Sequence, residues 1–546
     1  MKTIFNKFSF TAVAVAASMT LGSCADFLET TPYDFTQPQT FYQNETDCKM
    51  ALAGIYWTIS REDVYGNRYS CMLSNIDDLS YYRRPVSAIT NQVYGNDHNP
   101  SNSDIWKTWQ ALYAGINNAN LLLENIDRVQ MNEKTKKNIK GEAKFLRAYY
   151  HFLLAQAWYD VPVRKQSLQD INMTPMEATP HKEAIQWVID EMEACVDMVD
   201  DEDYDKSPSH VKKNTVMGIL ARVYLWQAGK FCEGGTKSYE KAAEWAGKVV
   251  ASDKHHLNKS YEELFKLMAQ DRYDAVYNES IWEAEFIGNR EADGLNNYTE
   301  GRIGNVIGLE QPKADNPIGL GYGFYGATYI LWDLYAENDK RRDLAISKEY
   351  YKKATNKPQY WKYDLVSEKK ITQVVQRTCG KYRRTWELSK GRSKTYTPQN
   401  YPILRYADVL LMWSEGLLES GASIEDALKG INLVRKRAGI DELQKETMDK
   451  EKLRKEIRNE RARELCFESL RKYDLVRWGI YYKAIHDDLG ERTSNKGSKP
   501  GQWPTGNNFV SADTYTKNTQ EKHQFLPIPA LELDVNTKLE QNKFWK

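Results

Sequence analysis

Paired cysteines and the common catalytic motifs are missing from this 546-residue chain. Its seven cysteines include no Cys-x-x-Cys pair, which leaves zinc ribbons and thioredoxin-like chemistry without support. Neither His-Glu-x-x-His nor Gly-x-Ser-x-Gly occurs, and the eight histidines are dispersed. We therefore predict no metal, no cofactor and no catalytic residue.

An excess of charge of one sign is also absent. Lys plus Arg and Asp plus Glu both number 75. Nucleic-acid binding needs a basic surplus, so this balance argues against a nucleic-acid partner. After the first two dozen residues, no apolar run approaches the ~20 residues that cross a bilayer.

The N-terminus carries an export signal. Lys2 and Lys7 precede a mostly apolar run at residues 8–17, and Leu-Gly-Ser-Cys24 follows. This order is typical of a secretory signal, and its ending resembles a bacterial lipobox. We predict removal of residues 1–23, lipidation of Cys24 and a polar linker over residues 24–40. The alternative is an ordinary secretion signal that happens to end in cysteine.

Helical periodicity dominates the body of the chain. Apolar residues recur at steps of four and three at Ile139, Ala143, Leu146, Tyr150, Leu153 and Ala157. Similar patterns predict helices over residues 104–126, 139–159, 180–200, 215–227, 238–252, 406–420 and 424–438. Most form helix–turn–helix units that resemble tetratricopeptide repeats, although no partner is evident for residues 180–200. Cys195 and Cys466 fall in helix-like patterns and are predicted to be buried thiols.

Three stretches interrupt this pattern at residues 61–103, 283–326 and 350–401. They are rich in aromatic residues in a chain with 35 Tyr, 15 Trp and 16 Phe. Long irregular insertions in a compact domain are usually functional. We thus predict an all-α fold, with helix pairs as a scaffold, large irregular loops and a few short strands. One strand is expected at residues 280–287, with Trp282 on its buried face.

An ordered set of motifs resembles the SusD/RagB family of outer-membrane nutrient-binding lipoproteins of Bacteroidetes. The motifs are Cys24 with Asp26-Phe-Leu-Glu29, residues 113–120, the helix at 140–158, residues 405–412, 459–465, 473–479 and 525–529, and Asn536 with Gln541-Asn542. They run through essentially the whole mature chain. The ending departs from the family's usual Gln-Asn-Pro-Gly-Tyr, because Lys543-Phe-Trp545 follows Asn542.

The resemblance implies one helical domain over residues 41–546, with an N-terminal part at about 41–255 and a C-terminal part at about 275–546. It implies a lipid-anchored protein on the outer membrane, exposed at the cell surface, that captures oligo- or polysaccharide without chemical turnover. The implied partner is a SusC-like TonB-dependent transporter, over which the lipoprotein sits as a lid. Helical repeats would contact the transporter, and aromatic loops would hold the sugar.

Two loops supply the ring faces and planar polar groups that sugar recognition needs. The candidate glycan-binding residues are Tyr81, Tyr82, Arg83, Asn96, Tyr298, Arg302, Tyr322, Phe324 and Tyr325. Family ligand residues vary, so these candidates are not motif matches. The alternative for each tyrosine is that it packs its own loop.

Other functions stay open at this stage. Glu460 and Glu464 lie one helical turn apart and could hydrolyse a glycoside, but neighbouring arginines favour an ion-pair network. Residues 321–326 match Gly-x-Gly-x-x-Gly, yet Asn316-Pro317 precedes them where a nucleotide site needs a strand. Two further alternatives are a peptide- or glycopeptide-binding member of the family and an assembly lipoprotein without a ligand.

Overall fold

The computed structural model describes residues 41–546 apart from 86–88, 169–172, 202–206, 287–300, 312–318, 353–354, 356, 362–370, 389–394, 498–501 and 506–508. Helices make up most of it, and the all-α prediction is confirmed. No helix in these ranges is long and apolar enough to cross a membrane.

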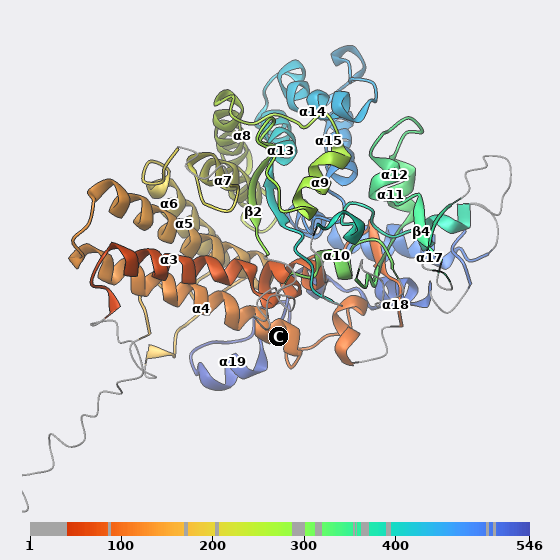
Figure 1. The fold of residues 1–546 in the computed structure, drawn as a ribbon. Helices are drawn as coiled ribbons and strands as arrows, with labels where there is room; N and C mark the ends of the chain where they lie inside the picture. The colour runs from red at the N-terminus through yellow and green to blue at the C-terminus, as the bar shows by residue number, and fades with distance from the viewer. Residues whose placement is uncertain are drawn as a thin grey trace, which may run out of the picture.

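Two groups of helices form the scaffold (Figure 1). The first comprises α3 (Glu45–Ser60), α4 (Ser103–Asn125), α5 (Glu133–Trp158) and α6 (His181–Cys195). The second comprises α7 (Lys213–Ala228), α8 (Gly235–Ala251), α13 (Tyr406–Ser420), α14 (Ile424–Ala438) and α15 (Lys450–Leu465). The seven predicted helices are all present, and α6, predicted without a partner, packs against α5 and α7.

Local capping explains where several helices begin and end. The Asn132 side chain accepts hydrogen bonds from the backbone N–H groups of Lys134 and Thr135, at 2.9 and 3.2 Å, so α5 begins six residues before the predicted start. Helix α14 ends as predicted, because Gly439 adopts the left-handed conformation (φ 76°) that a C-terminal cap favours.

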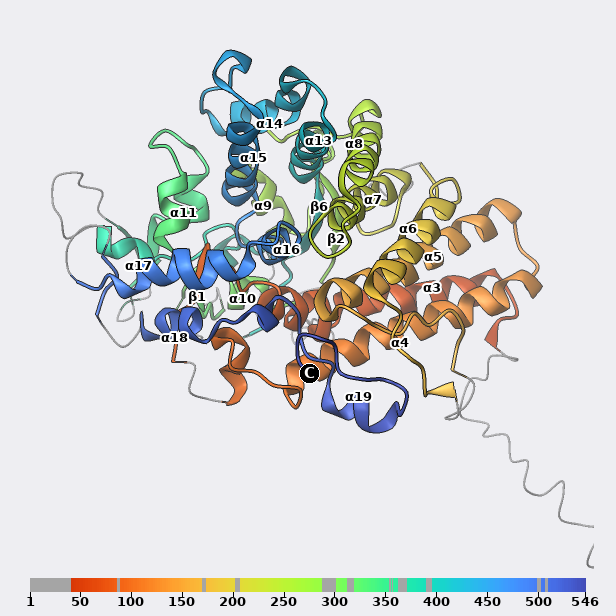
Figure 2. The same ribbon diagram turned by 180° about the vertical axis from the view of Figure 1, so that it is seen from behind.

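The remaining helices are short and belong to the loop-rich side of the molecule and the chain end. They are α9 (Tyr261–Ala269), α10 (Ile303–Val306), α11 (Tyr329–Leu334), α12 (Arg342–Ala345), α16 (Arg471–Arg477), α17 (Gly490–Ser494), α18 (Val510–Asn518) and α19 (Ala530–Val535). The C-terminal segment with α19 returns to the first group of helices (Figure 2), where the Ala530 N–H donates to the Pro100 carbonyl at 2.9 Å.

Short antiparallel strand pairs join distant parts of the sequence. Strand β1 (Ser80–Tyr82) pairs with β3 (Tyr325–Ala327), β2 (Ser280–Ala284) with β6 (Tyr401–Arg405), and β4 (Glu349–Tyr351) with β5 (Pro358–Tyr360). Strand β2 falls within the predicted stretch, and Trp282 is fully buried on it. This part of the sequence prediction is confirmed.

Glu460 and Glu464 lie in the core, where both side chains are fully buried. The Arg341 guanidinium donates to Glu460 at 2.6 Å and to Glu464 at 2.9 Å. Burial by itself would raise the pKa of Glu464, but nearby arginines, led by Arg437 and Arg405, lower it far below the ordinary value. The two carboxylates thus form the ion-pair network that the sequence favoured.

All six cysteines of the described ranges are buried and free of disulfide bonds. The prediction that Cys195 and Cys466 are buried thiols is confirmed. Burial also raises the pKa of the Cys195 thiol to about 12, which keeps it protonated and unreactive at neutral pH.

Candidate functional site

The pairing of β1 with β3 brings the two predicted sugar-binding loops together. Tyr82 lies opposite Tyr325, and the Arg83 N–H donates to the Phe324 carbonyl at 2.7 Å. The Arg83 guanidinium also donates to the Gly323 carbonyl, which is 240 residues away in sequence, at 3.1 Å. Five candidates therefore meet in this strand pair or directly beside it: Tyr81, Tyr82, Arg83, Phe324 and Tyr325.

The inner part of this assembly is closed to solvent. The Tyr82 ring stacks on Tyr94 with centroids 4.0 Å apart, and Tyr325 meets both rings edge-on. Tyr81 packs against Trp503 and donates its hydroxyl to the Val375 carbonyl at 2.6 Å. Tyr81, Tyr82 and Tyr325 are at most 5% exposed, so their ring faces are covered by protein.

The outer part consists of Tyr322 and Phe324, which are half-buried. Their rings lie almost parallel, with centroids 4.8 Å apart and an interplanar angle of 6°. The exposed Arg84 guanidinium lies 4.7 Å from the Phe324 centroid and 5.3 Å from the Tyr322 centroid. We call Tyr322 and Phe324 the ring pair; it offers flat apolar surface beside a cation.

Two features fix the position of the ring pair: the ion pair between Arg83 and Glu310, and the backbone conformation of Gly323. Arg83 forms an ion pair with Glu310 at 2.9 Å, which ties the end of β1 to the segment before the ring pair. Gly323 separates the two rings and has a φ of 52°; an added Cβ would lie 2.8 Å from the Glu310 Cβ. A residue with a side chain would be strained there, so glycine keeps the rings on one short bend.

Asn96 and Arg302 make other contacts. Asn96 is 4% exposed and donates to the Thr519 hydroxyl at 2.8 Å. Arg302 is partly buried beside Glu62, at 3.3 Å, at the start of α10. Tyr298 and Cys24 lie outside the described residues.

Arg84 and Glu310 are absent from the predicted set. Arg84 directly follows the predicted Tyr81–Arg83 run, so its basic charge beside aromatic residues was an available signal. Glu310 gave no local signal, because only the fold brings it to Arg83.

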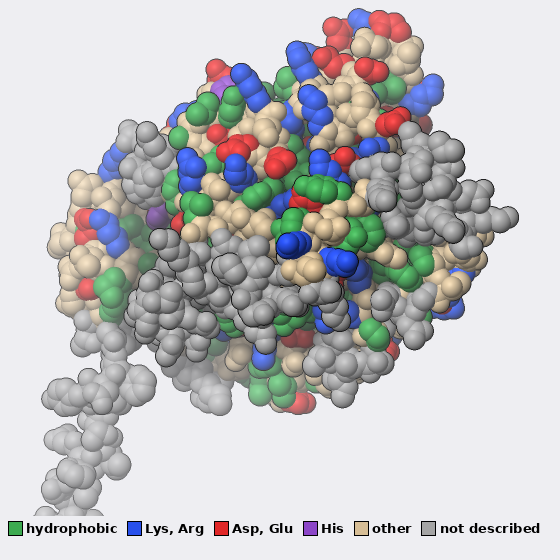
Figure 3. All heavy atoms as spheres, turned by 45° about the vertical axis from the view of Figure 1, so that its right-hand side comes forward, with side chains coloured by type: hydrophobic (Ala, Val, Ile, Leu, Met, Phe, Trp, Pro, Cys, Tyr) green, Lys and Arg blue, Asp and Glu red, His purple; other side chains and the backbone are tan. Residues whose placement is uncertain are grey.

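On the face in Figure 3, hydrophobic side chains lie among basic and acidic side chains. A surface of this mixed character suits ligands that are partly apolar and partly polar.

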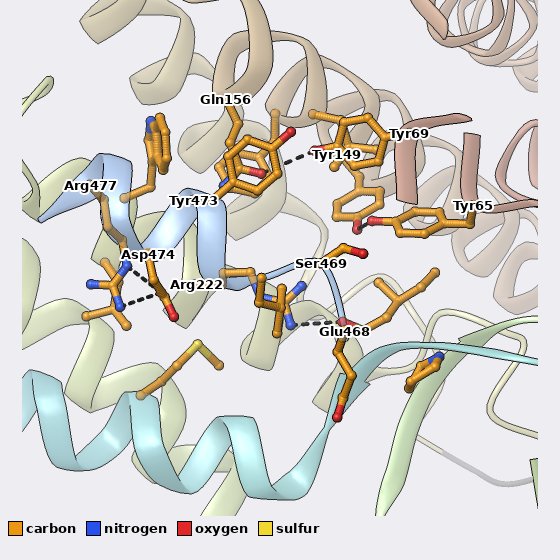
Figure 4. A pocket seen from close by; sticks show the side chains of 18 of the residues that line it. Tyr65, Tyr69, Tyr149, Gln156, Arg222, Glu468, Ser469, Tyr473, Asp474 and Arg477 are labelled. Carbon is orange, nitrogen blue, oxygen red and sulfur yellow. Dashed lines mark hydrogen bonds and ion pairs between the residues drawn. The ribbon is translucent and has the colours of Figure 1, made fainter. Parts of the chain in front are cut away.

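A separate internal cavity is lined by tyrosines and charged groups (Figure 4). The Tyr65 and Tyr149 hydroxyls are hydrogen-bonded to each other, and Tyr69 donates to Gln156 at 3.3 Å. The cavity measures about 40 Å³, and about 10–15 Å³ is enough to hold one water molecule. It therefore has room for water.

Two family models match the chain. The model described as "SusD family" matches residues 278–545, and one described as "Starch-binding associating with outer membrane" matches residues 26–225. SusD-like protein P25 of Formosa agariphila is 24% identical over 94% of both chains.

Solved structures share the fold. A SusD homolog from Bacteroides thetaiotaomicron has a TM-score of 0.81 and 26% identity, over 92% of this chain and 98% of its own. Surface glycan-binding protein A from the same species, in complex with laminarihexaose, has a TM-score of 0.68 and 17% identity, over 92% and 100%. The sequence motifs, the helical scaffold and these matches agree, and the chain belongs to the SusD family.

Proposed function

We propose that the protein binds an oligo- or polysaccharide through the ring pair and passes it, chemically unchanged, to a SusC-like TonB-dependent transporter. The observation that carries this proposal is the half-buried parallel pair of Tyr322 and Phe324 beside Arg84. Pyranose rings stack on flat aromatic surfaces, and guanidinium groups donate to hydroxyls. The laminarihexaose complex of a protein with the same fold supports saccharide as the ligand class.

Burial divides the predicted residues into two roles. Tyr322, Phe324, Arg83 and the added Arg84 can reach a ligand. We assign Tyr81, Tyr82 and Tyr325 to support of the ring pair, because stacking on a sugar requires an exposed ring face and these side chains are enclosed. Asn96 is also buried and is bonded to Thr519, so we assign it no ligand contact. Tyr298 and Arg302 stay candidate contacts.

Binding without turnover agrees with the position of the carboxylates considered for hydrolysis. Glu460 and Glu464 are fully buried and bonded to arginines, so neither faces a place where a glycan could lie. The related proteins are named for binding, which supports the same conclusion.

Isothermal titration calorimetry against plant, microbial and host glycans tests the proposal. Phe324→Ala and Tyr322→Ala should each weaken binding by about 1–3 kcal/mol, by analogy with base stacking, with almost no change in melting temperature. Tyr360→Ala removes an exposed ring from β5 and serves as the control. Unchanged affinity in both ring-pair variants would contradict the proposal.

The description "associating with outer membrane" supports an outer-membrane location for the chain. We propose that Cys24 carries the lipid anchor, since several acyl chains on one residue hold a protein stably to a membrane. Cys24→Ala should abolish incorporation of labelled palmitate and move the protein out of the membrane fraction. Labelling that persists in the variant would refute lipidation at this residue.

A further inference from the structure

A groove separate from the ring pair lies where the C-terminal half of α3 meets the end of β2. Its volume is about 460 Å³, and none of the ring-pair residues lines it. In Figure 1, β2 runs toward this end of α3. The lining residues that matter here are Tyr56, Trp57, His210, Glu283, Glu285 and Phe286. We call it the Trp57 groove.

One wall of the Trp57 groove is aromatic. The Trp57 side chain is 53% exposed, whereas Trp109, Trp158, Trp282 and Trp503 are almost fully buried. Tyr56 is held beside it, because its hydroxyl accepts from the Val211 N–H at 2.9 Å and the His210 ring meets it edge-on at 5.4 Å. An exposed indole on a fixed wall offers the flat apolar face on which a sugar ring can stack.

The other wall carries hydrogen-bond acceptors. Glu283 accepts from the Asn400 amide at 3.0 Å, and Glu285 accepts from the Ser207 hydroxyl at 2.8 Å and the Tyr273 hydroxyl at 3.0 Å. Glu283 is buried, whereas Glu285 is half-buried. A carboxylate has about four acceptor positions, so Glu285 can take a further hydroxyl donor.

The charge of the groove narrows the ligand class. The half-buried Glu285 is acidic, and the Arg61 guanidinium, which lies over the Trp57 ring at 5.1 Å from its centroid, is bonded to Asp63 at 2.8 Å. Carboxylated or sulfated sugars would be repelled. A neutral sugar would supply hydroxyl donors and an apolar ring face without adding negative charge.

We propose that the Trp57 groove is a second saccharide-binding site, in which a neutral sugar ring stacks on Trp57 and donates a hydroxyl to Glu285. It extends the proposed function from one binding surface to two. A polymer that reaches both sites would gain affinity over a short oligosaccharide, because the second contact becomes intramolecular.

Fluorine NMR on protein labelled with 5-fluorotryptophan tests the groove directly. The Trp57 resonance is the one that Trp57→Phe removes. Maltohexaose, laminarihexaose, cellohexaose, xylohexaose and mannohexaose are the probes. At least one should shift this resonance saturably, both in the wild type and in Phe324→Ala, where the ring pair is disabled.

Calorimetry in the Phe324→Ala background supplies the second measurement. Trp57→Ala and Glu285→Gln should each lower the association constant at least fivefold for the probe that shifts Trp57. Met50→Ala is the control, because Met50 is 59% exposed on the same helix but does not line the groove.

The proposal is overturned if no probe shifts the Trp57 resonance, or if Trp57→Ala and Glu285→Gln leave the affinity unchanged. If Phe324→Ala loses binding and no probe shifts the Trp57 resonance, the second site is rejected and the proposed function is kept. A shift at Trp57 with no effect of either ring-pair variant would support the groove and reject the ring pair.

Discussion

Asp77 is a buried carboxyl in the turn that leads into β1, the strand that ends beside the ring pair. It lies just before β1, where one of its oxygens accepts from the Leu79 N–H at 2.8 Å and the Ser80 N–H at 3.0 Å. Burial and the neighbouring Asp78 raise the pKa of Asp77 to about 7. A neutral carboxyl keeps the acceptor that the turn needs, whereas an ionised one adds the cost of a buried charge.

Asp77→Asn should reduce the pH dependence of stability. The folded pKa lies above the unfolded value, so the contribution of this group is fully present below about pH 4 and is lost as pH rises through about 7. Asparagine keeps the acceptor and does not titrate. Relative to wild type, the variant should gain at least about 1 kcal/mol in unfolding free energy between pH 5 and pH 8.

Denaturant unfolding at the two pH values measures this gain. Asp487→Asn, at a half-exposed carboxyl, is the control. The same stability difference between Asp77→Asn and wild type at both pH values would show that Asp77 does not titrate in this range.

At the scale of elements, local periodicity determined how well the fold could be predicted. Residues 406–420 and 424–438 coincide with α13 and α14, because both helices repeat apolar residues every three or four positions. The partner of β2 could not be predicted, since β6 pairs with it across more than a hundred residues through backbone bonds that leave no mark on composition.

The candidate site, like the fold, could be predicted only in part from the sequence. The composition of the two aromatic loops pointed to the residues that β1 and β3 bring together. It could not tell which rings remain exposed, because Tyr81 is covered by Trp503 and Val375 from distant parts of the chain. Exposure is a property of the assembled fold, and only the structure separates the ring pair from the enclosed tyrosines.

Close helix packing gives a prediction with opposite outcomes at two glycines. In α13, an added Cβ on Gly416 would lie 2.8 Å from the Ala243 backbone nitrogen in α8, too close for a normal contact. Gly416→Ala should cost about 1–3 kcal/mol of stability. In α3, a Cβ on Gly54 meets nothing within 4 Å, so Gly54→Ala should add about 0.5–1 kcal/mol.

Thermal or denaturant unfolding of both variants checks this pair. If both variants were stabilised, helix propensity, and not the distance between α8 and α13, would control stability at these positions. If both were destabilised, the expected gain at Gly54 would be wrong.

At the scale of the whole molecule, the N-terminal and C-terminal parts are bonded to each other at several separate places. Arg222 of α7 pairs with buried Asp408 of α13 at 2.7 Å, and Asp78 pairs with Arg471 at 2.8 Å. The Leu526 N–H donates to the carbonyl of Ala157, in α5, at 2.7 Å. Strand β1 has its partner β3 in the C-terminal part. Each part alone would leave buried charges and backbone groups without partners.

We therefore expect residues 41–546 to unfold as one cooperative unit, and neither 41–255 nor 275–546 to fold alone. Calorimetry of the whole protein should show a single transition, and each separate part should give no cooperative melting and little chemical-shift dispersion. Mixing the two parts should restore some structure, because the contacts between them bury apolar surface that each part alone exposes to water. If either part melted cooperatively near the temperature of the whole protein, the chain would consist of two domains, and the strand pair that presents the ring pair would be an interface between them.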